Sequence, residues 1–271
     1  MDGVVAATSD EAPLQFLQLV ADPFRWQILG HLARSDRRVG EIAQLVGKAQ
    51  NLVSYHLGTL RSAQIVSARR SSADGRDTYY RLNLARCGAL LVTAGAALHP
   101  ALRLAPVPPQ PPRTRTRPKQ RVLFLCTGNS ARSQMAEALL ANRSGGAIEA
   151  RSAGSHPKAL HPNAVRVMAE RGIDISACPT KHLGRFAHTR FDRVITLCDK
   201  VKEICPEFPG APITAHWSMA DPAAAAQGDR DSYPEFVRAA EEIETRVELL
   251  IAELTHQAAI EAIERSVHVA Q

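Results

Sequence analysis

A cysteine and an arginine, Cys126 and Arg132, bracket a short loop of small residues. The apolar run Val122-Leu-Phe-Leu125 before the loop is typical of a buried parallel strand, and a helical pattern follows it. Backbone N–H groups of such a loop can point at one oxyanion, and the helix N-terminus adds positive potential. The same field stabilises a cysteine thiolate, the form that attacks. This pattern predicts an oxyanion site with Cys126 as nucleophile, the alternative being a purely structural strand-to-helix turn.

The chemistry of the neighbouring residues suggests their roles. Arg132 can hold two oxyanion oxygens in a bidentate fork, and Ser133 can donate its hydroxyl to the sulfur. Asp221, which follows a predicted strand in His216-Trp-Ser-Met-Ala-Asp221-Pro222, can give a proton to a leaving oxygen. Gly128 and Asn129 tolerate the positive backbone dihedrals of a tight loop. The predicted oxyanion-binding residues are Thr127, Gly128, Asn129, Ser130, Ala131 and Arg132.

Alternating strand and helix patterns surround this loop in the second half of the chain. Such alternation predicts an α/β fold with a central parallel sheet covered on both faces. The predicted strands are Arg121–Leu125, Ile148–Ser152, Arg193–Leu197 and Ile213–His216, and the predicted helices are about Ser130–Asn142, Pro162–Arg171 and Tyr233–Leu254.

The first half has the pattern of a mainly α winged helix-turn-helix. Four helices are predicted up to Ser62, then a hairpin at Asp74-Gly75, then a helix over about Leu84–Leu102. In the helix from Gln50 to Ser62, one face is apolar and packs inward, and the other is polar. The predicted DNA-binding residues are Gln50, Asn51, Ser54, Tyr55 and His56 of that helix and Arg69, Arg70 and Arg76 around the hairpin, the alternative being a solvated structural face.

The amino-acid composition along the chain indicates where one domain ends and the next begins. The segment 106–120 is rich in proline and arginine and reads as an extended linker. We therefore expect a DNA-binding domain over 1–105, a catalytic domain over 121–256 and a helical tail over 257–271. The first domain and the linker carry a charge of +4 each and residues 121–271 carry −2, so we expect nucleic-acid contact at the front of the chain. Without a membrane-span or signal-peptide pattern, we expect a cytoplasmic protein that contacts no membrane.

The first half resembles the ArsR-type repressors over LVADPFRWQILGHLARSDRRVGEIAQLVGKAQNLVSYHLGTLRSAQIVSARRSSADGRDTYYRLN. This resemblance implies a homodimer built through the first and last helices and a palindromic operator DNA. The family's thiol-rich sensor motif corresponds to Arg37-Arg38-Val39-Gly40-Glu41, which contains no cysteine. Cys87 alone, on an apolar helix, is expected to be a packed core residue.

The second half, from Arg121 to about Leu254, resembles low-molecular-weight phosphatases and the arsenate reductases that share their fold. Ser152-Ala-Gly154 matches the loop that supports the oxyanion cradle in that family. Cys198 and Cys205 match the positions used by thioredoxin-coupled arsenate reductases. The resemblance implies a relay in which Cys126 attacks arsenate, Cys198 attacks Cys126, and Cys205 attacks Cys198 to leave a disulfide for thioredoxin. The alternative is that Cys198 and Cys205 are two buried small hydrophobic residues, or a chance spacing in a simple phosphatase.

Three functions remain open at this stage. The sequence Asp221-Pro-Ala-Ala-Ala-Ala-Gln lacks the tyrosines that wall a phenyl ring in tyrosine phosphatases of this type, which favours an arsenate reductase fused to a regulator. The alternatives are a tyrosine phosphatase fused to a regulator, and a transcription factor whose second domain only senses arsenate or phosphate. No bound cofactor or metal is expected. Lys181 falls where some relatives have an acidic residue for a monovalent cation, so no such cation site is expected here. Ala131 replaces a second loop cysteine of the family, and Cys178 is expected to be structural.

Overall fold

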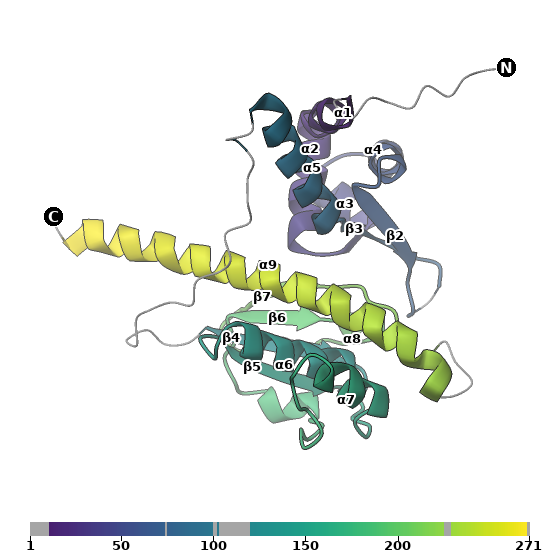
Figure 1. Ribbon diagram of the computed structural model, residues 1–271, viewed down its shortest axis with the longest axis vertical. Helices are drawn as coiled ribbons and strands as arrows, with labels where there is room; N and C mark the ends of the chain where they lie inside the picture. Colours follow the sequence, from purple (N-terminus) through teal and green to yellow (C-terminus); the bar gives the residue numbers. More distant parts are fainter. Residues whose placement is uncertain (1–10, 74, 100–101, 103–119, 225–228, 270–271) are drawn as a thin grey trace. The chain divides into compact units, whose positions relative to one another are not determined.

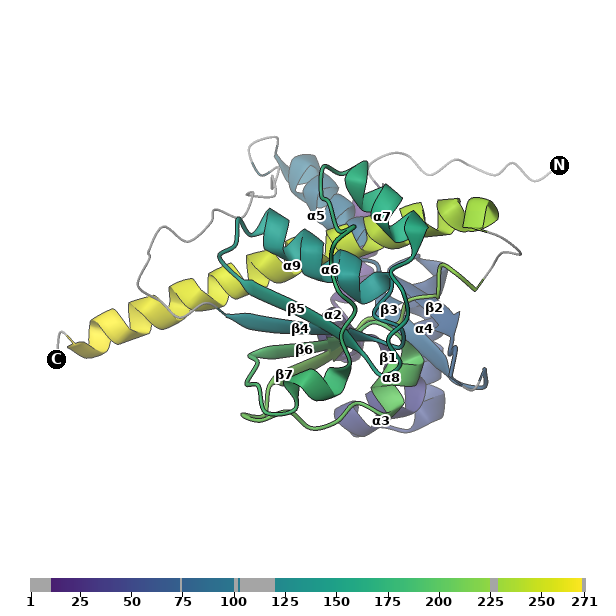
Figure 2. The same ribbon diagram turned by 90° about the horizontal axis from the view of Figure 1, so that it is seen from below.

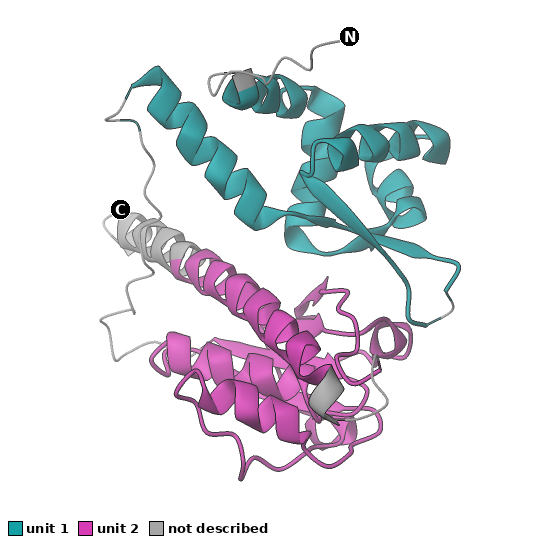
Figure 3. Ribbon diagram, turned by 45° about the vertical axis from the view of Figure 1, so that its right-hand side comes forward, with its two compact units in different colours: residues 1–107 teal, residues 108–271 magenta. Residues whose placement is uncertain are grey.

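The computed structural model describes residues 11–73, 75–99, 102, 120–224 and 229–269. The chain divides into two compact units, Met1–Val107 and Pro108–Gln271 (Figure 3). Each unit buries a hydrophobic core of its own. The linker predicted at 106–120 lies, apart from Gln120, outside the described residues. Over the described part of the chain, no helix is long and apolar enough to cross a membrane.

The first unit is a winged helix-turn-helix, as the sequence predicts (Figure 1). The Oδ1 of Asp22 caps the second helix by accepting from the N–H of Arg25 at 2.8 Å, and Gly47, at a φ of 62°, ends the third. The sheet is antiparallel with strand order β1-β3-β2. The elements are α1 (Glu11–Val20), α2 (Pro23–Arg34), β1 (Arg37–Arg38), α3 (Val39–Val46), α4 (Gln50–Ser62), β2 (Val66–Arg70), β3 (Thr78–Leu82) and α5 (Leu84–Leu98).

The last helix of this unit is shorter than predicted. Helix α5 ends at Leu98, whereas the sequence pattern placed its end near Leu102. The reason is Pro100, because the residue before a proline is disfavoured in the helical region. His99 accordingly has an extended backbone, with φ of −164° and ψ of 138°.

The second unit is built on a parallel four-stranded sheet of order β5-β4-β6-β7, which confirms the predicted α/β fold. Helices α6 and α7 both pack against α9, and Figure 2 shows these three helices grouped beside the strands. The elements are β4 (Arg121–Cys126), α6 (Arg132–Arg143), β5 (Glu149–Gly154), α7 (Pro162–Ala169), η2 (Leu183–Phe186), β6 (Arg193–Thr196), α8 (Asp199–Glu203), β7 (Ile213–His216) and α9 (Asp229–Val269).

Parallel pairing brings the carboxyl ends of three strands to one edge of this sheet. Leu125 of β4 is in register with Thr196 of β6, which is in register with His216 of β7. Loops after these strands therefore meet at one place, which is where ligands bind in open α/β sheets. The buried, apolar strand β4 fixes the position of the loop that follows Cys126.

Several boundaries differ from the prediction. Helix α6 begins at Arg132 rather than Ser130, because residues 127–131 form the loop. Helix α9 extends from Asp229 to Val269, beyond both predicted ends and through the boundary expected at 256. The short helices α8 and η2 were not predicted, because elements of five and four residues are too short to show a helical period.

Candidate active site

Cys126 is the last residue of β4, and its side chain is buried, with 2% of its surface exposed. Its Sγ lies 2.9 Å from the Oγ of Ser133. It also accepts a hydrogen bond from the backbone N–H of Asn129 at 3.2 Å. The structure therefore brings the predicted nucleophile, the predicted hydroxyl donor and a backbone donor of the predicted loop together around one sulfur.

The side chain of Asn129 orients the Ser133 hydroxyl. The Nδ2 of Asn129 donates to the Oγ of Ser133 at 2.9 Å and to the Oγ of Ser152 at 2.8 Å. Because Ser133 accepts this bond, its own hydrogen is available to the sulfur of Cys126. The Oδ1 of Asn129 accepts from the backbone N–H of Lys181 at 2.7 Å. Asn129 has the positive φ that its residue type allows, 47°, whereas Gly128 does not have a positive φ. The role of the Asn129 side chain was not predicted.

Gly154 allows the Ser152-Ala-Gly154 segment to approach the cradle closely. A Cβ at Gly154 would lie 2.6 Å from the carbonyl oxygen of Thr127 and 2.8 Å from the backbone nitrogen of Asn129. Both distances are shorter than van der Waals contact, and both atoms belong to the backbone. Only glycine fits beside the loop in this position.

We expect Gly154→Ala to destabilise the second unit by about 1–3 kcal/mol and to weaken oxyanion binding, because the methyl group must displace cradle backbone. Thermal unfolding and phosphate titration calorimetry measure the two effects. Gly30→Ala is the control, since a Cβ there meets no atom within 4 Å. Unchanged phosphate affinity in Gly154→Ala would show that the cradle does not depend on this contact.

An ion pair between Glu137 and Lys181 supports the same region. The Nζ of Lys181 lies 2.8 Å from the Oε2 of Glu137, and both side chains are largely buried. The hydroxyl of Ser152 donates to the same carboxylate oxygen. The lysine ammonium thus balances the carboxylate charge beside Asn129. No local sequence pattern indicates a role for Glu137, because its partner Lys181 is distant along the chain.

Arg132 and Asp221, predicted from separate motifs, lie side by side. The Nη2 of Arg132 is 3.4 Å from the Oδ2 of Asp221, and its Nη1 donates to the carbonyl oxygen of Met219 at 2.9 Å. The arginine side chain is 7% exposed, whereas that of Asp221 is 50% exposed. The carboxyl group is thus accessible to water, while the guanidinium is held in place at the start of α6.

Cys198 and Cys205, the two cysteines that the resemblance assigns to a relay, differ in their surroundings. Cys198 is buried at the N-terminus of α8, and its Sγ lies 3.2 Å from the Oγ1 of Thr127, a residue of the cradle loop. Cys205 follows α8 and is half-buried, and burial raises the pKa of its thiol above the ordinary value. Its Sγ donates weakly to the carbonyl oxygen of Pro206 at 3.7 Å. All five cysteines are free thiols in this structure.

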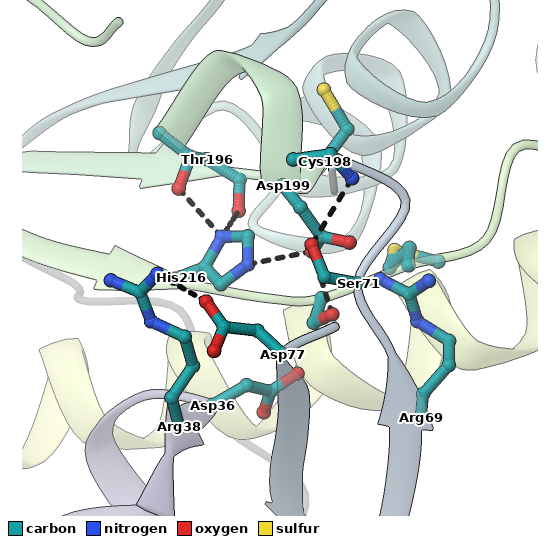
Figure 4. Close-up of polar contacts among 12 residues, drawn as sticks. Asp36, Arg38, Arg69, Ser71, Asp77, Thr196, Cys198, Asp199 and His216 are labelled. Atoms are coloured by element: carbon teal, nitrogen blue, oxygen red, sulfur yellow. Dashed lines mark hydrogen bonds and ion pairs between the residues drawn. The ribbon is translucent and has the colours of Figure 1, made fainter. Parts of the chain in front are cut away.

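A buried hydrogen-bond network next to Cys198 was not predicted. Asp199, the first residue of α8, accepts from the Nε2 of His216 at 3.1 Å (Figure 4). The Nδ1 of His216 lies 2.8 Å from the Oγ1 and 3.1 Å from the carbonyl oxygen of Thr196. No sequence pattern indicates this network, because it joins the ends of β6 and β7 to α8, a helix too short to predict.

In the first unit, α4 presents most of the predicted DNA-binding residues to solvent. Gln50, Asn51, Ser54 and Tyr55 are exposed, while the apolar face of the same helix is fully buried. His56 is half-buried instead, and its ring packs edge-on against Phe24 with centroids 4.8 Å apart.

The predicted wing is the hairpin of β2 and β3. Arg70 and Arg76 are exposed and Arg69 is half-buried. The guanidinium of Arg70 donates to the carbonyl oxygen of Gly75, so this side chain folds back along the hairpin. At the base of the wing, Arg38 forms an ion pair with Asp77 at 2.7 Å, which ties the start of α3 to the hairpin (Figure 4).

Among the described residues, no group of three or more histidine, cysteine, aspartate or glutamate side chains could hold a metal ion. Cys87 is half-buried against the core of the first unit, and burial raises the pKa of its thiol. Cys178 packs against the core of the second unit.

Residues 121–260 match the family described as low molecular weight phosphotyrosine protein phosphatase, and residues 22–68 match the bacterial regulatory protein, arsR family. The arsenate reductase of Halalkalibacterium halodurans is 38% identical over 129 residues, which cover 48% of this chain and 93% of that protein. The arsenate reductase of Brevibacillus brevis is 40% identical over 129 residues, covering 48% and 92%. The solved structure of an arsenate reductase in the oxidized state is 32% identical, covers 49% of this chain and 98% of its own, and has a TM-score of 0.44.

The loop around Cys126 lies within the residues that match the phosphatase family, and helix α4 lies within the residues that match the regulator family. Through residues 121–260 the chain therefore belongs to the low molecular weight phosphotyrosine protein phosphatase family, and it carries an ArsR-family helix-turn-helix domain ahead of them.

Proposed function

We propose that the second unit reduces arsenate to arsenite with Cys126 as nucleophile. The observation that carries this proposal is the pair of contacts to the sulfur, from the N–H of Asn129 and the Oγ of Ser133, at the N-terminus of the helix that begins with Arg132. Such donors are suited to a negatively charged sulfur and to the oxyanion that it attacks. The arsenate reductases that are 38% and 40% identical to this region support the choice of substrate.

In the first step, the sulfur of Cys126 attacks the arsenic of arsenate and a sulfur–arsenic bond forms. One arsenate oxygen leaves as water, and Asp221 is placed beside Arg132 to give it a proton. Arg132 holds two of the remaining oxygens. Arsenic is still pentavalent at this point, so the reduction requires further thiols.

Two thiols then supply the electrons. Cys198 attacks the sulfur of Cys126, the electron pair of the sulfur–arsenic bond passes to arsenic, and arsenite leaves as a disulfide forms between the two cysteines. The contact of Cys198 with Thr127 places this thiol at the cradle. Cys205 next attacks Cys198, which frees Cys126. Burial raises the pKa of the Cys205 thiol, and the thiolate is the form that attacks. We therefore expect the attack of Cys205 on Cys198 to accelerate as the pH rises toward this raised pKa.

The remaining disulfide between Cys198 and Cys205 needs a dithiol reductant, for which we propose thioredoxin or a similar protein. The test is arsenite formation by the wild-type chain with thioredoxin, its reductase and NADPH, run beside hydrolysis of p-nitrophenyl phosphate. We expect arsenite to form. Strong ester hydrolysis without arsenite would establish a phosphatase, and oxyanion binding without either reaction would establish a sensor.

We propose that the first unit binds operator DNA as a homodimer. The exposed polar residues of α4 are suited to base edges and the wing arginines to phosphates. Apolar side chains remain exposed on the two outer helices: Leu14 and Leu17 on α1, and Leu91 and Leu98 on α5. Their burial between two copies would place two α4 helices on one palindromic site.

We expect gel-shift affinity for the upstream region of the chain's own gene to fall steeply as salt rises, because phosphate contacts release counterions. Arg70→Ala should weaken binding to all sequences and lower the salt slope by about 1. Asn51→Ala should instead reduce discrimination between operator and unrelated DNA. Arg86→Ala, an exposed arginine at the start of α5, is the control. Equal effects of Arg86→Ala and Arg70→Ala would argue against a specific wing contact.

A further inference from the structure

The segment from His216 to Asp221 contacts two functional parts of the second unit. At one end, the carbonyl oxygen of Met219 and the carboxylate of Asp221 hold the guanidinium of Arg132. At the other end, His216 and Ser218 hold Asp199, the residue that follows Cys198. The backbone N–H of Trp217 also donates to the end of β6 at 2.8 Å, so the segment is fixed in the middle.

The hydrogen bonds from His216 and Ser218 to Asp199 converge on the same atom. The Nε2 of His216 lies 3.1 Å from Oδ1, and the Oγ of Ser218 donates to Oδ1 at 2.8 Å. The Nδ1 of His216 lies 2.8 Å from the Oγ1 of Thr196, a hydroxyl that can donate to it, which leaves Nε2 to donate to Asp199. Asp199 thus accepts from two side chains of the His216–Asp221 segment, and these bonds hold its buried carboxyl group in place.

Helix α8 depends on such a contact for its position. It has five residues, Asp199–Glu203, and a helix this short is held by its tertiary contacts rather than by its own hydrogen bonds. Asp199 is its first residue and is fully buried, and Cys198 is the N-cap residue directly before it. The position of the Cys198 sulfur next to Thr127 thus follows from where Asp199 is held.

We propose that Asp199 is a positioning residue that anchors the relay helix to the His216–Asp221 segment and so holds Cys198 at the cradle. This inference rests on the proposed reductase function, in which Cys198 meets first Cys126 and then Cys205. By holding Cys198 close to Thr127, the contacts of Asp199 favour the attack of Cys198 on the sulfur of Cys126. It acts through Cys198 and contacts no substrate, so the first step at Cys126 does not depend on it.

The experiment compares Asp199→Ala, Asp199→Asn and Glu207→Ala in the full chain. Alanine removes the acceptor atom, whereas asparagine keeps an oxygen at Oδ1 that can accept both bonds. Glu207 is an exposed carboxylate beyond Cys205 and is the matched control. The alkylation rates of Cys126, Cys198 and Cys205 with iodoacetamide are measured separately by peptide mass spectrometry under native conditions, beside turnover with arsenate.

We expect Asp199→Ala to raise the alkylation rate of Cys198 at least about tenfold and to lower arsenate turnover by a similar factor, with Cys126 alkylation unchanged. Asp199→Asn should restore both values, and Glu207→Ala should match the wild type. If Asp199→Ala does not fold, Ser218→Ala, which removes the bond from the Ser218 hydroxyl, should shift both values in the same direction by about threefold.

An unchanged Cys198 rate in Asp199→Ala, or an equal rise at Cys126, would overturn the proposal. So would an asparagine variant that behaves like alanine. The alkylation arm also separates this inference from the proposed function. If the wild type forms no arsenite while Cys198 responds as described, the reductase proposal fails and the anchor stands.

Discussion

Serine in place of Cys126 is expected to abolish arsenate reduction and p-nitrophenyl phosphate hydrolysis together, because in the proposed mechanism both reactions begin with attack by this sulfur. A hydroxyl oxygen at this position is a far weaker nucleophile at neutral pH than a thiolate. Cys198→Ser and Cys205→Ser are expected to abolish turnover with arsenate but to leave ester hydrolysis intact, since hydrolysis moves no electrons. Arsenite and nitrophenol, measured on the same preparations, give the two activities.

Cys178→Ser is the matched control for this series. Cys178 is a free thiol that packs against the core of the second unit, and no relay step uses it. Its replacement should leave both activities at the wild-type level. Sustained arsenate turnover by Cys198→Ser would contradict the relay, and a single-turnover burst of arsenite from Cys205→Ser would agree with it, since the first disulfide can still form.

The parts of the site that are local in sequence were predictable. The cradle lies within one strand, loop and helix, so the spacing of Cys126, Arg132 and Ser133 after an apolar strand was sufficient. Asp221 was predictable for a different reason, because loops after parallel strands collect at one edge of the sheet. The contact between Arg132 and Asp221 agrees with that argument.

The remaining parts depend on tertiary packing. The ion pair of Glu137 with Lys181 joins two segments whose proximity no local pattern encodes. The same is true of the bonds from His216 and Ser218 to Asp199, because α8 is too short to be recognised and its register against β7 is set by the sheet. For His56, the helical period assigned an outward position, but the ring of Phe24 from α2 draws it to the interior edge of α4.

The second large effect is expected from Arg132→Lys. Lysine keeps the charge but loses the planar fork, so it cannot hold two oxyanion oxygens while it also bonds the carbonyl oxygen of Met219. Removing one such donor from a buried oxyanion site costs about 10²–10³-fold in rate. We expect kcat/KM for arsenate to fall by that factor and phosphate affinity to fall with it, measured by steady-state kinetics and calorimetry.

Arg171→Lys provides a chemically parallel control. Arg171 also donates to a carbonyl oxygen, that of Val167, and pairs with a carboxylate, that of Glu244, but it lies outside the cradle. A loss of general packing or stability should therefore appear in both variants, whereas a loss of oxyanion binding should appear only in Arg132→Lys. If both variants lose kcat/KM equally, the guanidinium of Arg132 acts through the stability of the fold. If only Arg132→Lys does, its geometry at the cradle is what the reaction requires.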